Sequence, residues 1–176
     1  MSAVTNTPTN RNFLSPLNFR MVLQKAPLLN FFLQSASIPG LSFAGNISMP
    51  TPLLDIPIPG ERLVYSPLTV SFMVDEDMAN YIEIFNWMVS LSAKPLEPFA
   101  SYQAEKAVEP DVTKRARSDI KLMILTSSKN PNIEITFEDA FPTQLGELSF
   151  NSTSSSVNYL ETAVTFEYIK YSIAVI

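Results

Sequence analysis

The sequence contains no cysteine and no histidine among its 176 residues. Without cysteine there are no disulfides, no thiol nucleophiles and no structural zinc sites of the usual kind. Without histidine, no imidazole is available as a general base or as a metal ligand. The four glycines form neither a phosphate-binding loop nor a GxSxG turn. The sequence therefore predicts no enzyme, no catalytic residue, no metal site and no cofactor.

Charged residues are also scarce, at 16% of the chain, against about 25% in typical soluble domains. The formal net charge of −5 disfavours tight nucleic-acid binding, which needs clustered Lys and Arg. No apolar run approaches the ~18 residues that cross a bilayer, and the first residues lack a signal-peptide core, so no membrane partner is expected. With 12 Phe and 6 Tyr, the composition fits a well-filled monomer core and a surface covered by partner chains equally well.

The chain is expected to form one domain over residues 17–176, preceded by a polar, flexible arm over residues 1–16. Residues 91–117 contain three prolines and no clear periodicity, which predicts a long loop of the kind that often carries function. The loop ends in the basic cluster "KRAR", for which a solvated or partner-facing patch is favoured over a phosphate site.

Alternation of apolar and polar residues predicts a mainly β protein. The clearest strand is "LTVSFMV" at 68–74. Ala26-Pro27 and "KNP" at 129–131 predict hairpin turns between neighbouring strands. Further strands are expected at 18–24, 30–36, 118–128, 132–140 and, as one long strand, 157–175.

Six of the 14 prolines lie between residues 38 and 67. Prolines this frequent do not fit a central strand, so an extended excursion poor in hydrogen bonds is expected there. The interleaved Leu, Ile and Phe residues predict that this excursion packs on another surface, in preference to a disordered linker.

The period changes at residues 78–90, where apolar residues recur at helical spacing and predict one amphipathic helix. Its core stripe is expected to contain Met78, Tyr81, Ile82, Phe85, Met88 and Val89, widened by Ile84 and Trp87. Three acids, Asp75, Glu76 and Asp77, precede it. Consecutive residues point in different directions on a helix and do not converge on one metal, so the acids are interpreted as a helix start, with Asp75 as the cap and Glu76 and Asp77 in the first turn.

In the last third of the chain, one face of the predicted strands is apolar and the other carries acids and hydroxyls. Glu134 and Glu138 share a strand face, and a solvated face is favoured over a catalytic carboxylate pair because no pocket pattern accompanies them. On 157–175, Glu161 and Glu167 lie opposite the apolar residues.

The order of these segments resembles the tube-fold proteins of contractile phage tails. The resemblance covers the chain from about residue 17 onward. It depends on "PLNFRMVL", "FFLQSASIPGL", "IPGERLVYSPLTVSFMVDEDMANYIEIFNWM" and "FEDAFPTQLGELSF" followed by "VNYLETAVTFEYIKY". The wording around "SFMVDED" and "LMILTSSKNPNIEITF" is most similar to the members that complete the tube at its head-proximal end and stabilise the sheath.

The resemblance implies an α+β, mainly β fold: a tail-tube-like antiparallel β-sandwich or barrel with one amphipathic helix and long loops. It also implies a homo-hexameric ring in the virion tail, at the neck end, assembled in the host cytoplasm. The implied partners are tail tube, sheath and neck proteins. DNA would pass through the ring without specific binding, along a lumen for which Glu134, Glu138, Glu161 and Glu167 are the candidate acids.

Two alternatives within the family stay open: the repeating ring of the tube, and a ring that initiates the tube at the baseplate. A rival of another class is a monomeric β-rich module that binds carbohydrate or peptide through its aromatic residues.

Overall fold

The computed structural model describes residues 12–45, 47–91, 117–152 and 159–176. The N-terminal half contains β1 (Phe19–Leu23), α1 (Pro27–Phe31), β2 (Leu33–Ala36), β3 (Leu41–Ala44), β4 (Ile47–Pro50), β5 (Asp55–Ile58), β6 (Arg62–Tyr65), β7 (Leu68–Met73) and α2 (Ala79–Ser90). The C-terminal half contains β8 (Ser118–Leu125), β9 (Pro131–Leu145), β10 (Glu161–Glu167) and β11 (Lys170–Val175).

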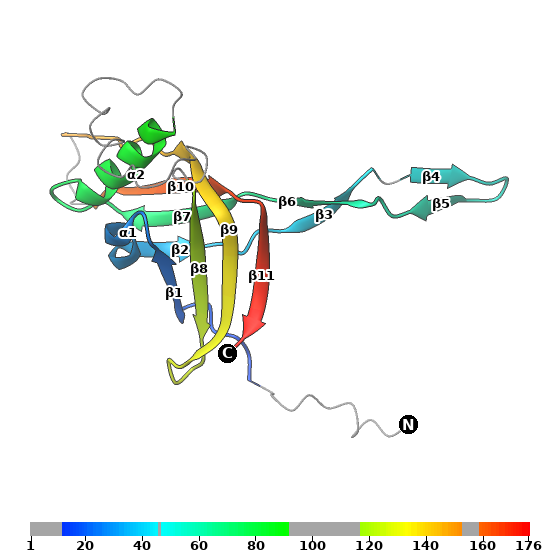
Figure 1. Cartoon of the computed structure of the whole chain (residues 1–176), viewed down its shortest axis with the longest axis horizontal. Coiled ribbons are helices and arrows are strands. Elements are labelled where there is room, and N and C mark those ends of the chain that lie inside the picture. The colour runs from blue at the N-terminus through cyan, green and yellow to red at the C-terminus, as the bar shows by residue number, and fades with distance from the viewer. Residues whose placement is uncertain (1–11, 46, 92–116, 153–158) are drawn as a thin grey trace, which may run out of the picture.

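Two antiparallel sheets make up the body of the molecule. We call them sheet A, formed by β1, β8, the first part of β9 and β11, and sheet B, formed by the end of β9 with β10, β7 and β2. The strands of one sheet run across those of the other (Figure 1). Over the described residues the strand path is open and does not close into a barrel. The expected mainly β sandwich is confirmed, with two helices rather than one.

The hydrophobic core lies between the sheets because alternate residues of each strand point inward. On β7 the predicted alternation is confirmed, with Leu68, Val70 and Phe72 fully buried. Sheet A contributes Met21, Leu23, Ile120, Leu122, Ile124, Ile135 and Phe137, and β10 contributes Val164 and Phe166. Each such side chain stabilises the fold by about 1.5–3 kcal/mol.

Strand β9 passes from one sheet into the other. The change occurs near Asp139, which has a φ of 55° and whose N–H donates to Asp119 Oδ1 at 3.0 Å. After this bend the strand leaves β11 and pairs with β10. The prediction of one strand over 157–175 is wrong, because the chain turns at 168–169. Its two halves, β10 and β11, belong to different sheets.

The predicted hairpin between the first two strands is also wrong. Pro27 begins the short helix α1 instead, a position that suits proline because the first helical N–H has no partner within the helix. The strands on either side of α1 then enter different sheets.

Helix α2 begins at Ala79 with Met78, at a φ of 55°, as the N-cap residue. Glu76 and Asp77 therefore precede the helix, and their expected place in its first turn is wrong. The buried face contains Asn80, Ile84 and Trp87, with Trp87 packed 5.8 Å from the ring of Phe166. The predicted core stripe was rotated, because Ile82 and Phe85 are exposed. The buried polar Asn80 concealed the true stripe.

Asn80 joins the start of α2 to the end of β7. Its Nδ2 donates to the carbonyl of Met73 at 2.7 Å, and its Oδ1 accepts from the N–H of Asp75 at 3.4 Å. In return, Asp75 Oδ1 accepts from the backbone N–H of Asn80 at 3.3 Å. The capping role of Asp75 stays a prediction. The N–H that its carboxylate would cap is that of Asn80, in the first turn of α2.

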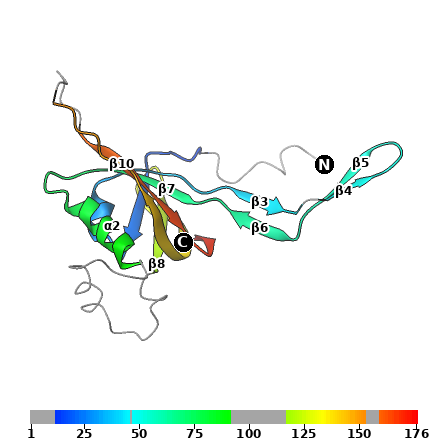
Figure 2. The same cartoon turned by 90° about the horizontal axis from the view of Figure 1, so that it is seen from above.

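The proline-rich segment forms a projecting arm, residues 41–45 and 47–65, which extends away from both sheets (Figures 1 and 2). It consists of two antiparallel ribbons, β3 with β6 and β4 with β5, so the expectation of few hydrogen bonds is wrong. Glycines allow a close approach where the ribbons meet. A Cβ on Gly60 would lie 1.9 Å from the carbonyl oxygen of Ala44, and Gly45 has a φ of +76°.

Replacing Asn80 should destabilise the protein. In Asn80→Ala, the Met73 carbonyl and the Asp75 N–H lose their partner, and each buried unsatisfied group costs about 1–3 kcal/mol. We expect the free energy of unfolding to fall by roughly 2–4 kcal/mol in urea denaturation. Asn86→Ala, on a less buried position of the same helix, is the control and should change stability by under about 0.5 kcal/mol. Equal effects of the two substitutions would contradict the role given to Asn80.

Candidate assembly interface

Strand β1 forms one open edge of sheet A. In an antiparallel ladder, alternate residues direct their N–H and C=O toward opposite sides of the strand. The N–H of Leu125, at the end of β8, donates to the carbonyl of Asn18 at 2.9 Å. The backbone N–H and C=O groups of the even-numbered residues of β1 therefore face β8. The backbone groups of Phe19, Met21 and Leu23 therefore point away from the sheet.

The end of this edge is already occupied. The N–H of Leu23 donates to Asn30 Oδ1 at 2.9 Å, and Asn30 Nδ2 donates to the carbonyl of Leu23 at 3.3 Å. The amide of Asn30 thus takes the place of a neighbouring strand at Leu23. Within the described residues the outward backbone groups of Phe19 and Met21 have no such partner.

Strand β11 forms the opposite open edge of sheet A. The N–H of Ile176 donates to the carbonyl of Asn132 on β9 at 3.0 Å, so even-numbered residues of β11 face β9. The backbone groups of Tyr171, Ile173 and Val175 point outward. Their side chains lie on the core side of the sheet, but Ile173 and Val175 are 59% and 80% exposed because no sheet covers them. Unpaired edges with apolar side chains favour association with another chain.

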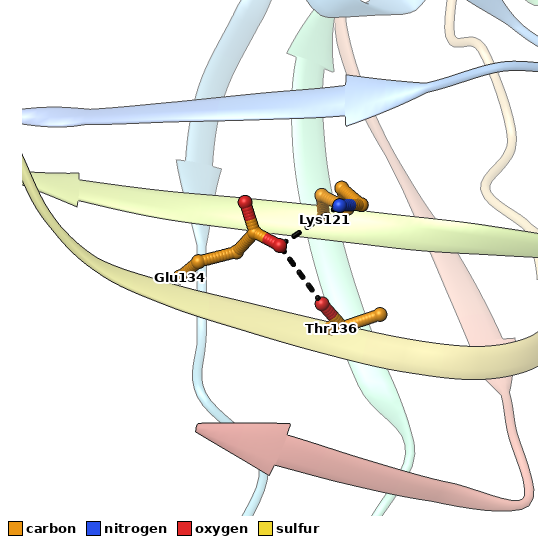
Figure 3. A network of polar contacts seen from close by, with 3 residues as sticks. All are labelled: Lys121, Glu134 and Thr136. Carbon is orange, nitrogen blue, oxygen red and sulfur yellow. Dashed lines mark hydrogen bonds and ion pairs between the residues drawn. The ribbon is translucent and has the colours of Figure 1, made fainter. Parts of the chain in front are cut away.

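The opposite side of sheet A, which we call its outer face, carries balanced charge. Alternation places three cations and three carboxylates on it: Arg20, Lys121 and Lys170 with Asp119, Glu134 and Glu138. Lys121 Nζ lies 2.8 Å from Glu134 Oε1, which also accepts from Thr136 Oγ1 (Figure 3). Lys170 lies 3.3 Å from Glu138. The hydrogen bond from Lys121 holds the pKa of Glu134 below its ordinary value of 4.5.

The four predicted lumen acids divide between the two sheets. Glu134 and Glu138 lie on the outer face of sheet A, whereas Glu161 and Glu167 are exposed at the two ends of β10 in sheet B. The structure therefore does not bring the four together. An acidic lumen stays a prediction, and if sheet A lines the lumen it concerns Glu134 and Glu138, each with a lysine beside it.

The arm presents large apolar side chains to solvent. In the outer ribbon, the cross-strand pairs Ile47–Ile58 and Met49–Ile56 share one face, and Pro50–Asp55 and Ser48–Pro57 share the other. All four apolar side chains of the first face are exposed, and Leu53 at the tip is 94% exposed. Prolines remove N–H groups from the strand edges, so a partner would pack on the apolar face. A two-stranded ribbon alone is marginally stable, which is a second reason to expect one.

An aromatic cluster fixes the base of the arm to the corner between β10 and β11. Tyr168 donates its hydroxyl to the carbonyl of Ser66 at 2.7 Å, and Tyr171 donates to that of Pro39 at 3.3 Å. Both rings contact Tyr65 and Phe137. Burial, with smaller contributions from Tyr171 and Tyr65, raises the pKa of Tyr168 to about 12. The arm is thereby held in a defined direction relative to sheet A.

Sequence reasoning missed Asn30 and the aromatic cluster. Proline after an alanine signals a helix start as well as a turn, and this was the only indication of α1.

The expected flexible arm (1–16) and most of the long loop (91–117), including Lys114 and Arg115, lie outside the described residues. Arg117 is described and lies 5.3 Å above the ring of Phe141.

Within the described residues, no group of acidic side chains could hold a metal ion. The same part of the chain contains no helix with the length and apolar character needed to cross a membrane.

Comparison with known proteins gives consistent matches. The family model for phage tail tube proteins matches residues 6–174. The tail tube terminator protein of Enterobacteria phage T4 is 28% identical over 143 residues, which cover 80% of this chain and 75% of that protein. Two solved structures have the same fold with a TM-score of 0.61. The tube-terminating cap of the anti-feeding prophage is 17% identical over 100% of both chains. The PVC sheath/tube terminator of an extracellular contractile injection system is 16% identical over 94% of this chain and 99% of that one.

Removing Lys121 should raise the pKa of Glu134. In Lys121→Met the carboxylate loses its main charged hydrogen-bond donor, so its pKa should move up toward 4.5 in a carbon-detected NMR titration. A folded-state pKa below the unfolded value stabilises the fold above that unfolded value, and the contribution is lost as pH falls through the folded pKa. The control Lys170→Met should leave the pKa of Glu134 at its value in the parent protein. The same titration curve for Glu134 in all three proteins would contradict the pairing.

Proposed function

This chain belongs to the phage tail tube protein family, and on that premise we propose that it forms the ring that ends the tail tube at the neck of a contractile tail. Its family and structural relatives are structural tail proteins, and it is a structural component rather than an enzyme. The observation that carries the proposal is the match to tube terminators over most of the chain, in sequence and in fold.

The ring closes through sheet A. Its strands alternate in direction along β1, β8, β9 and β11, so β1 of one copy is antiparallel to β11 of the next when the copies stand head to tail. The outward backbone groups on both edges belong to residues whose side chains lie on the core side. The joint therefore continues the apolar face without reversing it. Such a heterologous contact closes into a ring when the rotation permits, and the family resemblance implies six copies.

The outer face of sheet A lines the lumen in this arrangement, because sheet B and the core lie on the other side. Glu134 and Glu138 face the passage, and Lys121 and Lys170 compensate them. Such a wall offers phosphates no continuous row of cations, so it does not hold DNA by counterion release. DNA would pass without specific binding.

The arm supplies the contact along the tail axis. Its exposed apolar face, including Ile47, Met49 and Ile56, is suited to packing against the adjoining tube ring. The protein would also stabilise the sheath, a role supported by the fold shared with a sheath/tube terminator. The description of the matched family favours the repeating tube ring as the second candidate.

The protein should bind one end of a tail tube. We expect gold-labelled protein mixed with tail tubes to appear in negative stain as a ring-shaped cap at a single end, and capped tubes should stop elongating when tube subunits are added. Incorporation along the tube would instead identify the repeating ring. Dispersed monomers of about 20 kDa that ignore the tubes would contradict both and favour a monomeric binding module.

The apolar face of the arm should be needed for this binding. Met49→Asp places a charge where an apolar side chain would be buried, and burial of such a side chain contributes about 1.5–3 kcal/mol. Affinity for the tube end should therefore fall at least about tenfold in a pelleting assay. Ser48→Asp adds the same charge to the opposite face of the same strand and should leave affinity within about twofold. Melting temperatures should stay equal because both positions are exposed. Equal loss of binding in both variants would contradict the assigned face.

A further inference from the structure

The joint between copies has several possible registers. Because side chains alternate, only registers that differ by two residues keep the apolar side chains on the core side. Within the chain, the strands of sheet A pair without stagger: Phe19 is opposite Ile124, Ile124 is opposite Ile133, and Ile133 is opposite Val175. We call such an unstaggered register level. A level joint would place Val175 opposite Phe19 of the next copy and Tyr171 opposite Leu23.

The level joint conflicts with Asn30. The amide of Asn30 already occupies the outer side of Leu23, with hydrogen bonds of 2.9 and 3.3 Å. A strand adds at about 4.8 Å from its neighbour, so a Tyr171 level with Leu23 would need the space that this amide fills. One shift of β11 by two residues brings Ile173 opposite Leu23. This shift makes the conflict larger, because more of β11 then runs alongside Asn30.

The remaining shift removes the conflict. It places Tyr171 opposite Met21, and Ile173 opposite Phe19. The position beside Leu23 then falls to Ile169, where the chain has already left the strand. Closing a sheet into a barrel also requires a stagger of the register so that the strands tilt. A level joint in a level sheet gives no stagger, whereas this shift supplies two residues at every joint.

The shifted register also covers apolar surface. It brings Val175, which is 80% exposed, to the level of Leu17, which is 85% exposed. The level register leaves Leu17 beyond the end of the neighbouring strand. Burying two such side chains favours the shifted joint.

We propose that Asn30 is a positioning residue for ring assembly: by closing the β1 edge at Leu23, it fixes the neighbouring copy's β11 in the register Met21–Tyr171 and Phe19–Ile173. This inference rests on the proposed ring and deepens it, because it names the partner segment, the register and the residue that selects it.

Cysteine pairs can read this register, because the chain has no cysteine of its own. Across the joint, even-numbered residues form the closer, non-hydrogen-bonded pairs. In the shifted register Arg20 is opposite Ser172, and in the level register it is opposite Ala174. Within one chain β1 and β11 are separated by β8 and β9, about 14 Å, too far for a disulfide. Any bond therefore joins two copies.

The experiment compares two double variants of the full chain, Arg20→Cys with Ser172→Cys and Arg20→Cys with Ala174→Cys, after mild oxidation. On a non-reducing gel, the first should give a ladder of covalent oligomers about tenfold stronger than the second. A stronger ladder from the second variant would overturn the register. Rings in negative stain without a ladder from either variant would overturn the joint while leaving the proposed ring intact. An unoxidised parent that forms no rings and ignores tube ends would instead overturn the proposed function.

Asn30→Ala in both backgrounds tests the selecting residue. Opening the edge at Leu23 should lower the ratio of the first ladder to the second toward one, whereas Asn30→Asp, whose carboxylate still accepts from the Leu23 N–H but cannot donate to the Leu23 carbonyl, should keep the ratio closer to that of the parent pair. Circular dichroism melting shows which variants remain folded at the assay temperature, and the ladder ratio is compared only among those. An unchanged ratio in folded Asn30→Ala would overturn the role of Asn30.

Discussion

The structure depends on one strand that belongs to two sheets. Strand β9 pairs with β8 and β11 along its first part and with β10 after the bend at Asp139. This holds the sheets across each other with their apolar faces inward, and buries Phe137 of sheet A together with Phe166 of sheet B. It also places β11 beyond the cover of sheet B. The exposed apolar edge of β11 is therefore a direct consequence of the way the core is built.

The same arrangement separates three surfaces with different chemistry. The edges of sheet A expose backbone groups beside apolar side chains, which suits pairing between copies. The outer face of sheet A carries paired charges, which suits contact with water and a passing polyanion. The arm carries apolar residues on a ribbon whose base is fixed by Tyr168 and Tyr171. A monomer gains little from these surfaces, whereas the proposed ring, stacked on a tube, would use all three.

The low charge content, noted at the outset, acquires a location in this fold. Composition allowed either a large monomer core or apolar surface for partners. The described core is compact, and many large apolar side chains lie outside it, on the arm, on β11 and on the segment before β1: Phe13, Leu17, Phe43, Ile47, Leu53, Ile173 and Val175 among them. The distribution of these residues supports the second reading, because exposed apolar residues that cluster on projecting elements are typical of interfaces.

Local pattern by itself determined the strand at 68–74, the hairpin of β8 and β9, the existence of a helix near 79–90 and the mainly β class, because alternation and helical spacing depend on near neighbours in the chain. It did not determine which helix face is buried, since Asn80 enters the core only through hydrogen bonds to Met73 and Asp75. Nor did it separate β10 from β11 or Glu134 from Glu161, because these depend on which sheet each strand joins. Only the tertiary structure brought Asn30 to the edge of Leu23, where a side chain occupies a position that strand pairing would otherwise use.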